Sequence, residues 1–124
     1  GMSRNEKDLK SAIKEIKELR EDFHKNVKIP GGLNEFNEQL AKATRVSDFL
    51  ELGELFAIDA LERNESCGGH FREEFQTDDG EAIRDDKKFK FVSAWEYNDD
   101  PSKPILHKED LEYEDIEIKT RSYK

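Results

Sequence analysis

Apolar residues recur at helical spacing near the start of the chain. They fall on one face of a helix over residues 6–25, at Leu9, Ala12, Ile13, Ile16, Leu19 and Phe23. Asn5 stands just before this run, where its side chain can cap the helix, and Asp8 is placed to answer it. Pro30 disfavours helix in the residue before it. The pattern therefore predicts one helix over residues 6–25, stopped ahead of Pro30.

A longer apolar pattern predicts a second helix, from Leu33 or Asn34 to about Glu65. Its periodic positions are Phe36, Leu40, Ala43, Val46, Leu50, Gly53, Phe56, Ala57, Ala60 and Leu61, and the surface widens at Phe49, Leu52, Leu55 and Ile58. Such a wide apolar surface is buried on more than one side, so residues 46–61 should be the core element. Gly53 costs about 1 kcal/mol relative to Ala inside a helix, and close approach of another helix would explain it. One partner helix leaves a second side bare, for the C-terminal part or a partner to cover.

The rest of the chain predicts loop and β structure. Residues 66–88 are polar and indicate a surface loop, with one helical turn around Glu81–Asp86. Residues 89–119 predict a β-hairpin and a tail, with the return strand over residues 104–108. The first strand has one aromatic face, at Phe89, Phe91, Trp95 and Tyr97. An isolated hairpin is marginal, so this face should lie on the helices.

The acidic tail carries further apolar residues that predict one more strand or an extended segment. They are Leu111, Tyr113, Ile116 and Ile118. The expected fold class is mainly α: an antiparallel helical bundle with a small C-terminal β-hairpin extension, in a single domain.

Composition narrows the possible functions. The 124 residues are 34% hydrophobic and 41% charged, with a net charge of −9. This charge argues against binding a nucleic-acid backbone or an anionic membrane surface. No stretch approaches the ~18 apolar residues of a transmembrane helix. The single cysteine rules out an intrachain disulfide and fits a reducing compartment.

Cys67 and His70 have the C-x-x-H spacing of half a zinc site. The other half is missing, because His24 and His107 lie in unrelated segments and there is no second cysteine. A Cys–His nucleophile would need a third group to orient the histidine. The favoured interpretation is a helix C-cap, in which Gly68 or Gly69 adopts a left-handed conformation and His70 bonds nearby carbonyls.

The segment from Arg63 to Glu74 closely resembles a family signature. The matching residues are Arg63, Glu65, Ser66, Gly68, His70 and Arg72. The segment is similar to the C-terminal domain of the flavoprotein subunit of succinate dehydrogenase and fumarate reductase. The long second helix and residues 111–116 are similar to the same family, so the resemblance covers nearly the whole chain.

The resemblance implies a parent enzyme that interconverts succinate and fumarate through FAD. Its partners would be the flavin-binding domain of the same chain, an iron–sulfur subunit and a membrane anchor, and it would be cytoplasmic and peripheral to the inner membrane. It also implies that this chain binds no FAD and has no catalytic residue, and that the six matching residues serve structure and the interface. No metal is expected, because Cys67 and His70 supply only two of the four ligands of a structural site.

Two departures from the family are expected to matter. Cys67 stands where the family usually has an arginine. The family's spectrin-repeat-like three-helix bundle has a further helix ahead of the position of Met2, so part of the second helix should be exposed here and self-association of the chain is expected.

The alternative hypotheses are a free-standing acidic helical protein-interaction module and a small metal or thiol enzyme using Cys67 and His70.

Overall fold

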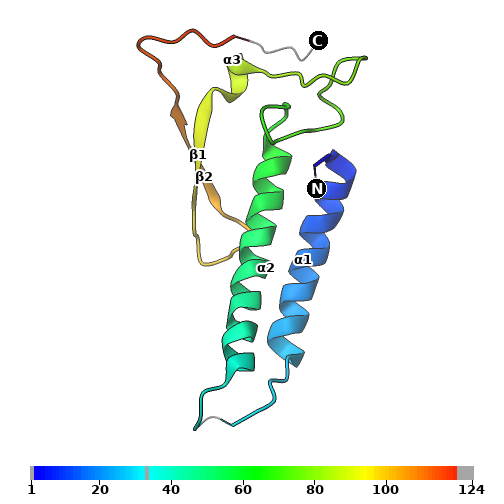
Figure 1. The fold of residues 1–124 in the computed structure, drawn as a ribbon, viewed down its shortest axis with the longest axis vertical. Helices are drawn as coiled ribbons and strands as arrows, with labels where there is room; N and C mark the ends of the chain where they lie inside the picture. The colour runs from blue at the N-terminus through cyan, green and yellow to red at the C-terminus, as the bar shows by residue number, and fades with distance from the viewer. Residues whose placement is uncertain (1, 33, 120–124) are drawn as a thin grey trace.

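The computed structural model describes residues 2–32 and 34–119, and contains two long antiparallel helices and one β-hairpin (Figure 1). The elements are α1 (Glu6–Asn26), α2 (Glu38–Glu62), the one-turn α3 (Asp86–Phe89), β1 (Phe91–Glu96) and β2 (Ile105–Asp110). The helices lie side by side along the long axis, and the hairpin runs beside α2. The predicted mainly α fold with a C-terminal hairpin is confirmed.

Helix α1 has the predicted N-cap. The Asn5 side chain accepts a hydrogen bond from the Asp8 amide at 2.8 Å and donates one to the Asp8 carboxylate at 2.9 Å. The helix ends at Asn26, before Pro30 is reached, and the Val27 amide donates to the Phe23 carbonyl. The sequence pattern therefore located both ends of α1 to within a residue.

Helix α2 is shorter at its N-terminal end than predicted. Leu33, one of the two expected start points, lies outside the described residues. Asn37 caps the helix by accepting hydrogen bonds from the amides of Gln39 and Leu40, each at 3.1 Å. Asn37 also donates to the Pro30 carbonyl at 3.0 Å. These local bonds hold the residues ahead of Glu38 in a loop, because a capping residue itself has non-helical dihedrals.

The C-terminal end of α2 also comes earlier than predicted. The last helical residue is Glu62, and Arg63 is already extended, with φ −82° and ψ 95°. The predicted continuation to Glu65 is wrong. Beyond Glu62, Arg63 donates to Glu65, and Glu65 also accepts from the Asp85 amide.

The hairpin is antiparallel, with Phe91 opposite Asp110 and Trp95 opposite Leu106. The predicted strand start at Phe89 is wrong, because Asp85 caps a helical turn that includes Phe89. This turn was expected slightly earlier, around residues 81–86. Beyond β2, residues 111–119 form no further strand, although the Leu111 amide donates to the Lys90 carbonyl at 3.0 Å.

Two of the predicted aromatic residues connect the hairpin to the helices. Phe91 is buried, and the Trp95 indole N–H donates to the Asp59 carboxylate at 2.8 Å. Tyr97 is 62% exposed, so the prediction is wrong for this residue. The hairpin therefore covers one side of α2 near its C-terminal half.

The apolar core is smaller than the pattern predicts. Its buried members are Leu9, Ala57 and Ala60, with Ile13 and Leu61 packed against them. Several residues expected in the core are exposed, among them Val46, Phe49, Leu52 and Phe56. They lie on a third side of α2 that neither α1 nor the hairpin covers. The predicted close approach at Gly53 is also absent from the described residues, because a Cβ there would meet no atom within 4 Å.

A buried ion pair occupies the closed side of α2. Glu54 is fully buried, and its carboxylate lies 2.7 Å from the guanidinium of Arg20, which is 9% exposed. Arg20 also donates to the Ser102 hydroxyl at 3.0 Å, so the pair links α1, α2 and the hairpin turn. The attraction between the two charges offsets the desolvation of the Glu54 carboxylate.

Removing one partner of this pair should be strongly destabilising. We expect Arg20→Met to lower the free energy of unfolding by about 3–5 kcal/mol, because it leaves a buried carboxylate without a counter-charge. Urea unfolding followed by circular dichroism measures the change.

The double variant Arg20→Met with Glu54→Leu should recover most of this loss, because no buried charge remains. The exposed pair Lys14–Glu18, at 3.7 Å, provides the control, and Lys14→Met should change stability by less than about 1 kcal/mol. A loss at Arg20 as small as that at Lys14 would contradict the prediction.

Candidate functional site

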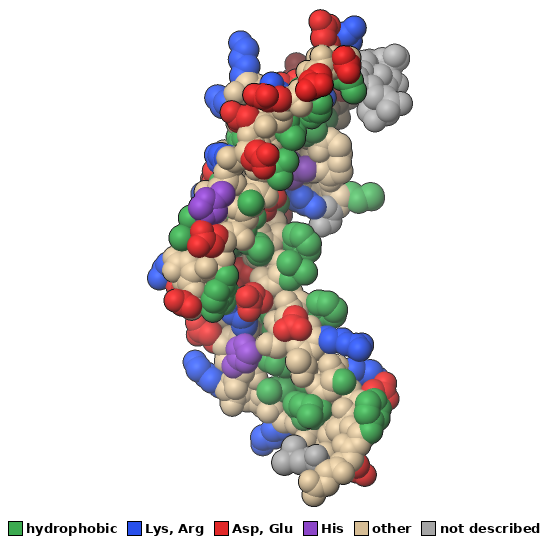
Figure 2. Space-filling model, turned by 90° about the vertical axis from the view of Figure 1, so that its left-hand side faces the viewer, with side chains coloured by type: hydrophobic (Ala, Val, Ile, Leu, Met, Phe, Trp, Pro, Cys, Tyr) green, Lys and Arg blue, Asp and Glu red, His purple; other side chains and the backbone are tan. Residues whose placement is uncertain are grey.

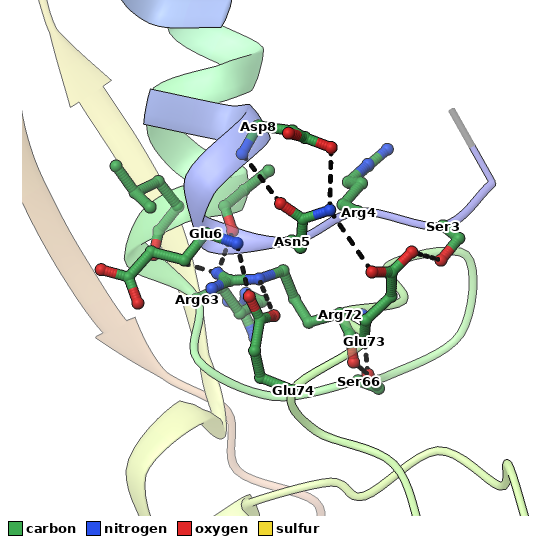
Figure 3. Close-up of polar contacts among 12 residues, drawn as sticks. Ser3, Arg4, Asn5, Glu6, Asp8, Arg63, Ser66, Arg72, Glu73 and Glu74 are labelled. Carbon is green, nitrogen blue, oxygen red and sulfur yellow. Dashed lines mark hydrogen bonds and ion pairs between the residues drawn. The ribbon is translucent and has the colours of Figure 1, made fainter. Parts of the chain in front are cut away.

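The signature segment lies where α2 ends and α1 begins (Figure 3). Within it, Cys67 and His70 exchange two backbone hydrogen bonds of 2.8 and 3.0 Å, which close a tight turn. Gly68 has φ +57°, the left-handed conformation that glycine adopts without strain. The expected left-handed glycine is therefore present, but it serves this turn and does not cap α2.

Arg72 is the central side chain of the site. It is 1% exposed, and its guanidinium donates to the carbonyls of Ala60 and Leu61 at 3.0 and 3.3 Å. These carbonyls lie in the last turn of α2, where helical partners run out and the helix dipole favours a cation. Its Nε donates to the Glu74 carboxylate at 3.1 Å. The same guanidinium therefore caps α2 and forms an ion pair with Glu74.

Glu74 extends this link to α1. Its carboxylate accepts a hydrogen bond from the Glu6 amide, the first residue of the helix. Desolvation raises the pKa of Glu74, but hydrogen bonds from the amides of Glu6 and Glu74, together with the Arg72 guanidinium, outweigh it and hold the pKa below its usual 4.5. The path from Arg72 through Glu74 therefore joins the C-terminus of α2 to the N-terminus of α1.

The N-terminal segment is also held through its backbone. The Arg4 amide donates to the Phe71 carbonyl at 3.2 Å, and the Glu73 amide donates to the Arg4 carbonyl at 2.8 Å. The Glu73 carboxylate accepts from the Ser3 hydroxyl at 2.7 Å and from the Asn5 amide group at 3.3 Å. The signature segment thus fixes the entry to α1 from both sides (Figure 3).

Ser66 and Glu65 are buried and hydrogen-bonded. The Ser66 hydroxyl accepts from the Arg72 amide at 2.8 Å and lies 3.1 Å from the Arg72 carbonyl, to which it donates. Glu65 accepts from Arg63 at 2.9 Å and from the Asp85 amide at 2.8 Å. Ser66 therefore closes the loop between residues 66 and 72, and Glu65 connects the end of α2 to the segment before α3.

Arg63 attaches the hairpin. Its guanidinium donates to the carbonyls of Phe89 and Phe91 at 3.0 and 3.1 Å. It also lies 5.0 Å from the centroid of the Phe91 ring, within the range of a cation–π contact. Arg63 thus links the C-terminal end of α2 to the start of β1.

His70 has both ring nitrogens engaged. Nε2 lies 2.9 Å from the Arg63 carbonyl, which only accepts, so Nε2 carries the proton. Nδ1 then accepts from the Arg4 guanidinium at 3.1 Å. The expected bonding of His70 to a nearby carbonyl is confirmed. In this arrangement the imidazole has no free nitrogen to deprotonate the Cys67 thiol.

A metal site is not assembled either. Among residues 2–32 and 34–119, no group of three or more His, Cys, Asp and Glu side chains is arranged to hold an ion. His107 instead lies 2.6 Å from Glu96 on the exposed face of the hairpin.

A cavity of about 500 Å³ opens beside the signature turn. Its lining residues are Arg4, Phe56, Asp59, Ala60, Arg63, Cys67 and His70. Sequence reasoning singled out Arg63, Cys67 and His70 but missed Arg4. No sequence signal marked Arg4, because the parallel pairing of its backbone with Arg72 is a contact between distant segments.

The buried pair of Arg20 and Glu54 was also missed, although a signal existed. Arg20 continues the spacing of Leu9, Ile13 and Ile16, and Glu54 interrupts the series Leu50, Ala57 and Leu61 at the same spacing. A single charge on the apolar face of each of two antiparallel helices indicates a buried partner.

The fold and the site define a helical domain whose signature residues bond to other parts of the same chain. The family model of the fumarate reductase flavoprotein C-terminus matches residues 1–123. The chain therefore belongs to this family, as a C-terminal domain of a succinate dehydrogenase or fumarate reductase flavoprotein. No curated protein matches the chain in sequence.

The residues described here do not fit a flavin. Dinucleotide-binding folds hold the pyrophosphate at a glycine-rich turn between a strand and a helix of a parallel sheet. Residues 2–32 and 34–119 contain one sheet, which consists of the antiparallel pair β1 and β2.

None of the described helices has the length and apolarity needed to cross a membrane.

Replacing Arg72 by lysine should break the link between the helices. An ammonium group cannot reach the Ala60 and Leu61 carbonyls and Glu74 with the same planar set of donors. We expect the free energy of unfolding to fall by about 2–3 kcal/mol, the usual scale for charge-assisted hydrogen bonds. Hydrogen exchange of the Glu6 amide should accelerate in the same variant. Arg45→Lys is the control, because Arg45 is exposed, and an equal effect there would disprove the assignment.

The lowered pKa of Glu74 predicts a pH effect with a defined sign. The folded pKa lies below 4.5, so the stabilisation is present above about pH 4.5 and is lost as the pH falls through the lowered value. Glu74→Gln should therefore reduce this acid-side loss of stability. Urea unfolding across the acid range measures it, with Glu117→Gln in the exposed tail as control. An acid limb unchanged in Glu74→Gln would count against the role of this carboxylate.

Proposed function

We propose that the chain is the non-catalytic C-terminal domain of a flavoprotein subunit that interconverts succinate and fumarate. FAD and the dicarboxylate would be bound by other parts of the parent protein. Electrons would pass from the flavin to an iron–sulfur subunit and on to a membrane quinone. The parent would be cytoplasmic and held at the inner membrane through its anchor subunit.

The use of the signature side chains supports a structural role. Glu65, Ser66 and Arg72 are buried, and each bonds to another part of this chain. His70 has no free ring nitrogen, as described above. Groups occupied in this way hold an architecture together and are engaged in structural bonds.

The open side of α2 supports an interface with the rest of the parent. Phe49 and Phe56 are 65% and 67% exposed there. Apolar side chains that gather at an exposed face of a protein mark interaction surfaces. We propose that this side of α2 makes the chain by itself prone to self-association. The flavin-binding domain of the parent would meet the domain at the separate signature segment, Arg63–Glu74.

A free-standing acidic interaction module is the second candidate. The exposed aromatic residues of α2 support it equally, because a helix face can bind a partner helix in any protein. Family membership over residues 1–123 favours the first candidate. A reading frame that continues upstream into a flavin-binding domain would distinguish the two.

Replacement of His70 in the intact parent tests the structural role. We expect His70→Ala to weaken assembly, because the Arg63 carbonyl and the Arg4 guanidinium lose their shared partner. Light scattering of the purified complex and its FAD content measure assembly. The turnover per bound flavin should stay within about twofold of the unmodified protein.

His24→Ala is the matched control, since His24 lies in the last turn of α1 away from the signature segment. It should leave both assembly and turnover unchanged. A His70→Ala complex that assembled normally but no longer reduced its flavin would show that the residue takes part in the chemistry and that the proposal is wrong.

A further inference from the structure

A second cavity lies on the hairpin side of α2. Its volume is about 90 Å³, and its walls come from α2, from β1 and from the turn between β1 and β2. Helix α2 contributes Glu51 and Leu55, and the turn contributes Pro101 and Pro104. Neither the signature segment nor the exposed phenylalanines of α2 line it. Figure 2 views the molecule from the hairpin side, where acidic and hydrophobic side chains adjoin one another.

Two aromatic residues, Trp95 and Tyr97, also line this cavity. The Trp95 indole N–H donates to the Asp59 carboxylate at 2.8 Å, so the orientation of the ring is fixed before any ligand arrives. The faces of aromatic rings carry a partial negative charge and attract cations, most strongly at tryptophan. The aromatic wall therefore favours a cationic group over an anionic one.

The turn that carries the two prolines is held in one shape. The Asp100 carboxylate pairs with Lys103 at 3.0 Å and accepts from the Ser102 amide at 3.0 Å. These two contacts, with Lys103 the larger cause, hold the pKa of Asp100 below its usual 3.8. The Ser102 hydroxyl also accepts from the buried Arg20 at 3.0 Å, which ties the turn to α1. A ligand entering the cavity therefore does not have to order this wall.

Glu51 supplies a carboxylate without a counter-charge. Its side chain has no ion-pair partner within 4 Å in the part of the chain that the structure describes. Glu96, the other acidic residue at the cavity, lies 2.6 Å from His107. Among the described residues that line the cavity none is basic, and Lys103 in the nearby turn already pairs with Asp100. The cavity therefore has an acidic group that only an external cation can neutralise.

The size and lining of the cavity restrict the occupant to the end of one side chain. Sites for small molecules usually have volumes of roughly 300–1,000 Å³, several times the volume found here. An anion would be repelled by Glu51, and a purely apolar group would remove water from this carboxylate without replacing it. A lysine side chain combines a compact ammonium group with a flexible apolar stem, which suits both the charged and the apolar parts of the lining.

A lysine presented by a protein fits the site better than a free amine. Solvent-accessible ion pairs and cation–π contacts each contribute little, so a small amine would be held weakly. Apolar surface continues beside the cavity, because Tyr97 is 62% exposed and Ile105, which follows Pro104, is 44% exposed. Residues that flank a lysine in a partner protein can pack on these side chains and add to the contact.

We propose that the cavity lined by Glu51, Trp95 and Tyr97 is a docking site for a lysine side chain of a partner protein. The ammonium group lies against the aromatic rings and pairs with the Glu51 carboxylate, and the lysine stem packs on Leu55 and the prolines. The inference goes beyond the proposed function, because the cavity is separate from the signature segment. It is also compatible with self-association through the open side of α2.

The test follows the indole N–H resonance of Trp95 by NMR in the 124-residue chain. Trp95 is the only tryptophan, so this signal is unambiguous. The probe is a short peptide with one lysine between two leucines and no other charged side chain. Its twin carries norleucine in place of lysine, which keeps the alkyl stem and removes the ammonium group. The lysine peptide should bind with a Kd on the order of 1 mM, about fivefold more tightly than the twin.

Variants of the lining should remove the preference for lysine. We expect Glu51→Gln and Tyr97→Leu each to reduce the ratio of the two affinities to below about twofold, because one attraction for the cation is lost. Both residues are exposed, so the fold should be kept, which circular dichroism verifies. Glu38→Gln at the start of α2 and Tyr113→Leu beyond β2 are the matched controls. Neither residue lines the cavity, and both variants should retain the full ratio.

Several results would overturn the proposal. Equal affinity for the two peptides, or an indole resonance that does not move at about 10 mM of either, would show that the cavity does not recognise lysine. A preference that survives in Glu51→Gln would exclude the carboxylate as its cause. Binding of n-butylammonium as tight as that of the lysine peptide would assign the cavity to free amines. A peptide affinity that falls as the protein concentration rises would identify a lysine of a second copy as the occupant.

Discussion

The guanidinium of Arg72 is the interaction on which the helical end of the molecule depends. A buried cation is costly unless it is paired and hydrogen-bonded, and here two carbonyls in the last turn of α2 and the carboxylate of Glu74 accept from the guanidinium. The Glu74 carboxylate in turn receives the first amide of α1. One charged group thereby satisfies the exposed backbone groups at two helix ends, which would otherwise need caps of their own.

A buried ion pair occupies the closed side of α2. Glu54 and Arg20 meet there under the hairpin turn. The opposite side of the same helix exposes Phe49 and Phe56 to solvent. This distribution is the reverse of that in a self-sufficient domain, where charges face water and aromatic side chains fill the core. Among the described residues, α2 therefore buries a charged pair on one side and leaves aromatic side chains exposed on another.

The sequence of the segment from Arg63 to Glu74 has a physical explanation in this arrangement. Ser66 binds both the amide and the carbonyl of Arg72, which closes the loop between them. Gly68 allows the tight turn inside that loop, and His70 connects it to Arg63 and to the N-terminal segment. Each residue type is needed for its backbone or hydrogen-bonding properties. A motif can thus be specific without being catalytic, which agrees with the proposed role as a C-terminal structural domain.

The sequence by itself determined the local elements. Periodicity and the Asn5 cap located α1, and alternation located the hairpin, because these signals depend on neighbouring residues only. The signature run also indicated the family whose model matches residues 1–123. Periodicity misplaced both ends of α2: at the start the Asn37 cap bonds to nearby residues in the preceding loop, and at the end Arg63 bonds to the distant Phe89 carbonyl.

The tertiary structure alone decided which polar groups meet. Arg4 and His70 lie far apart in sequence, as do Arg20 and Ser102, and no spacing rule links them. It also decided which side of α2 stays open, because a helical pattern shows how much surface is apolar but not what covers it. Burial and pairing depend on the packing of whole elements, and that information appears only once the helices and the hairpin are placed together.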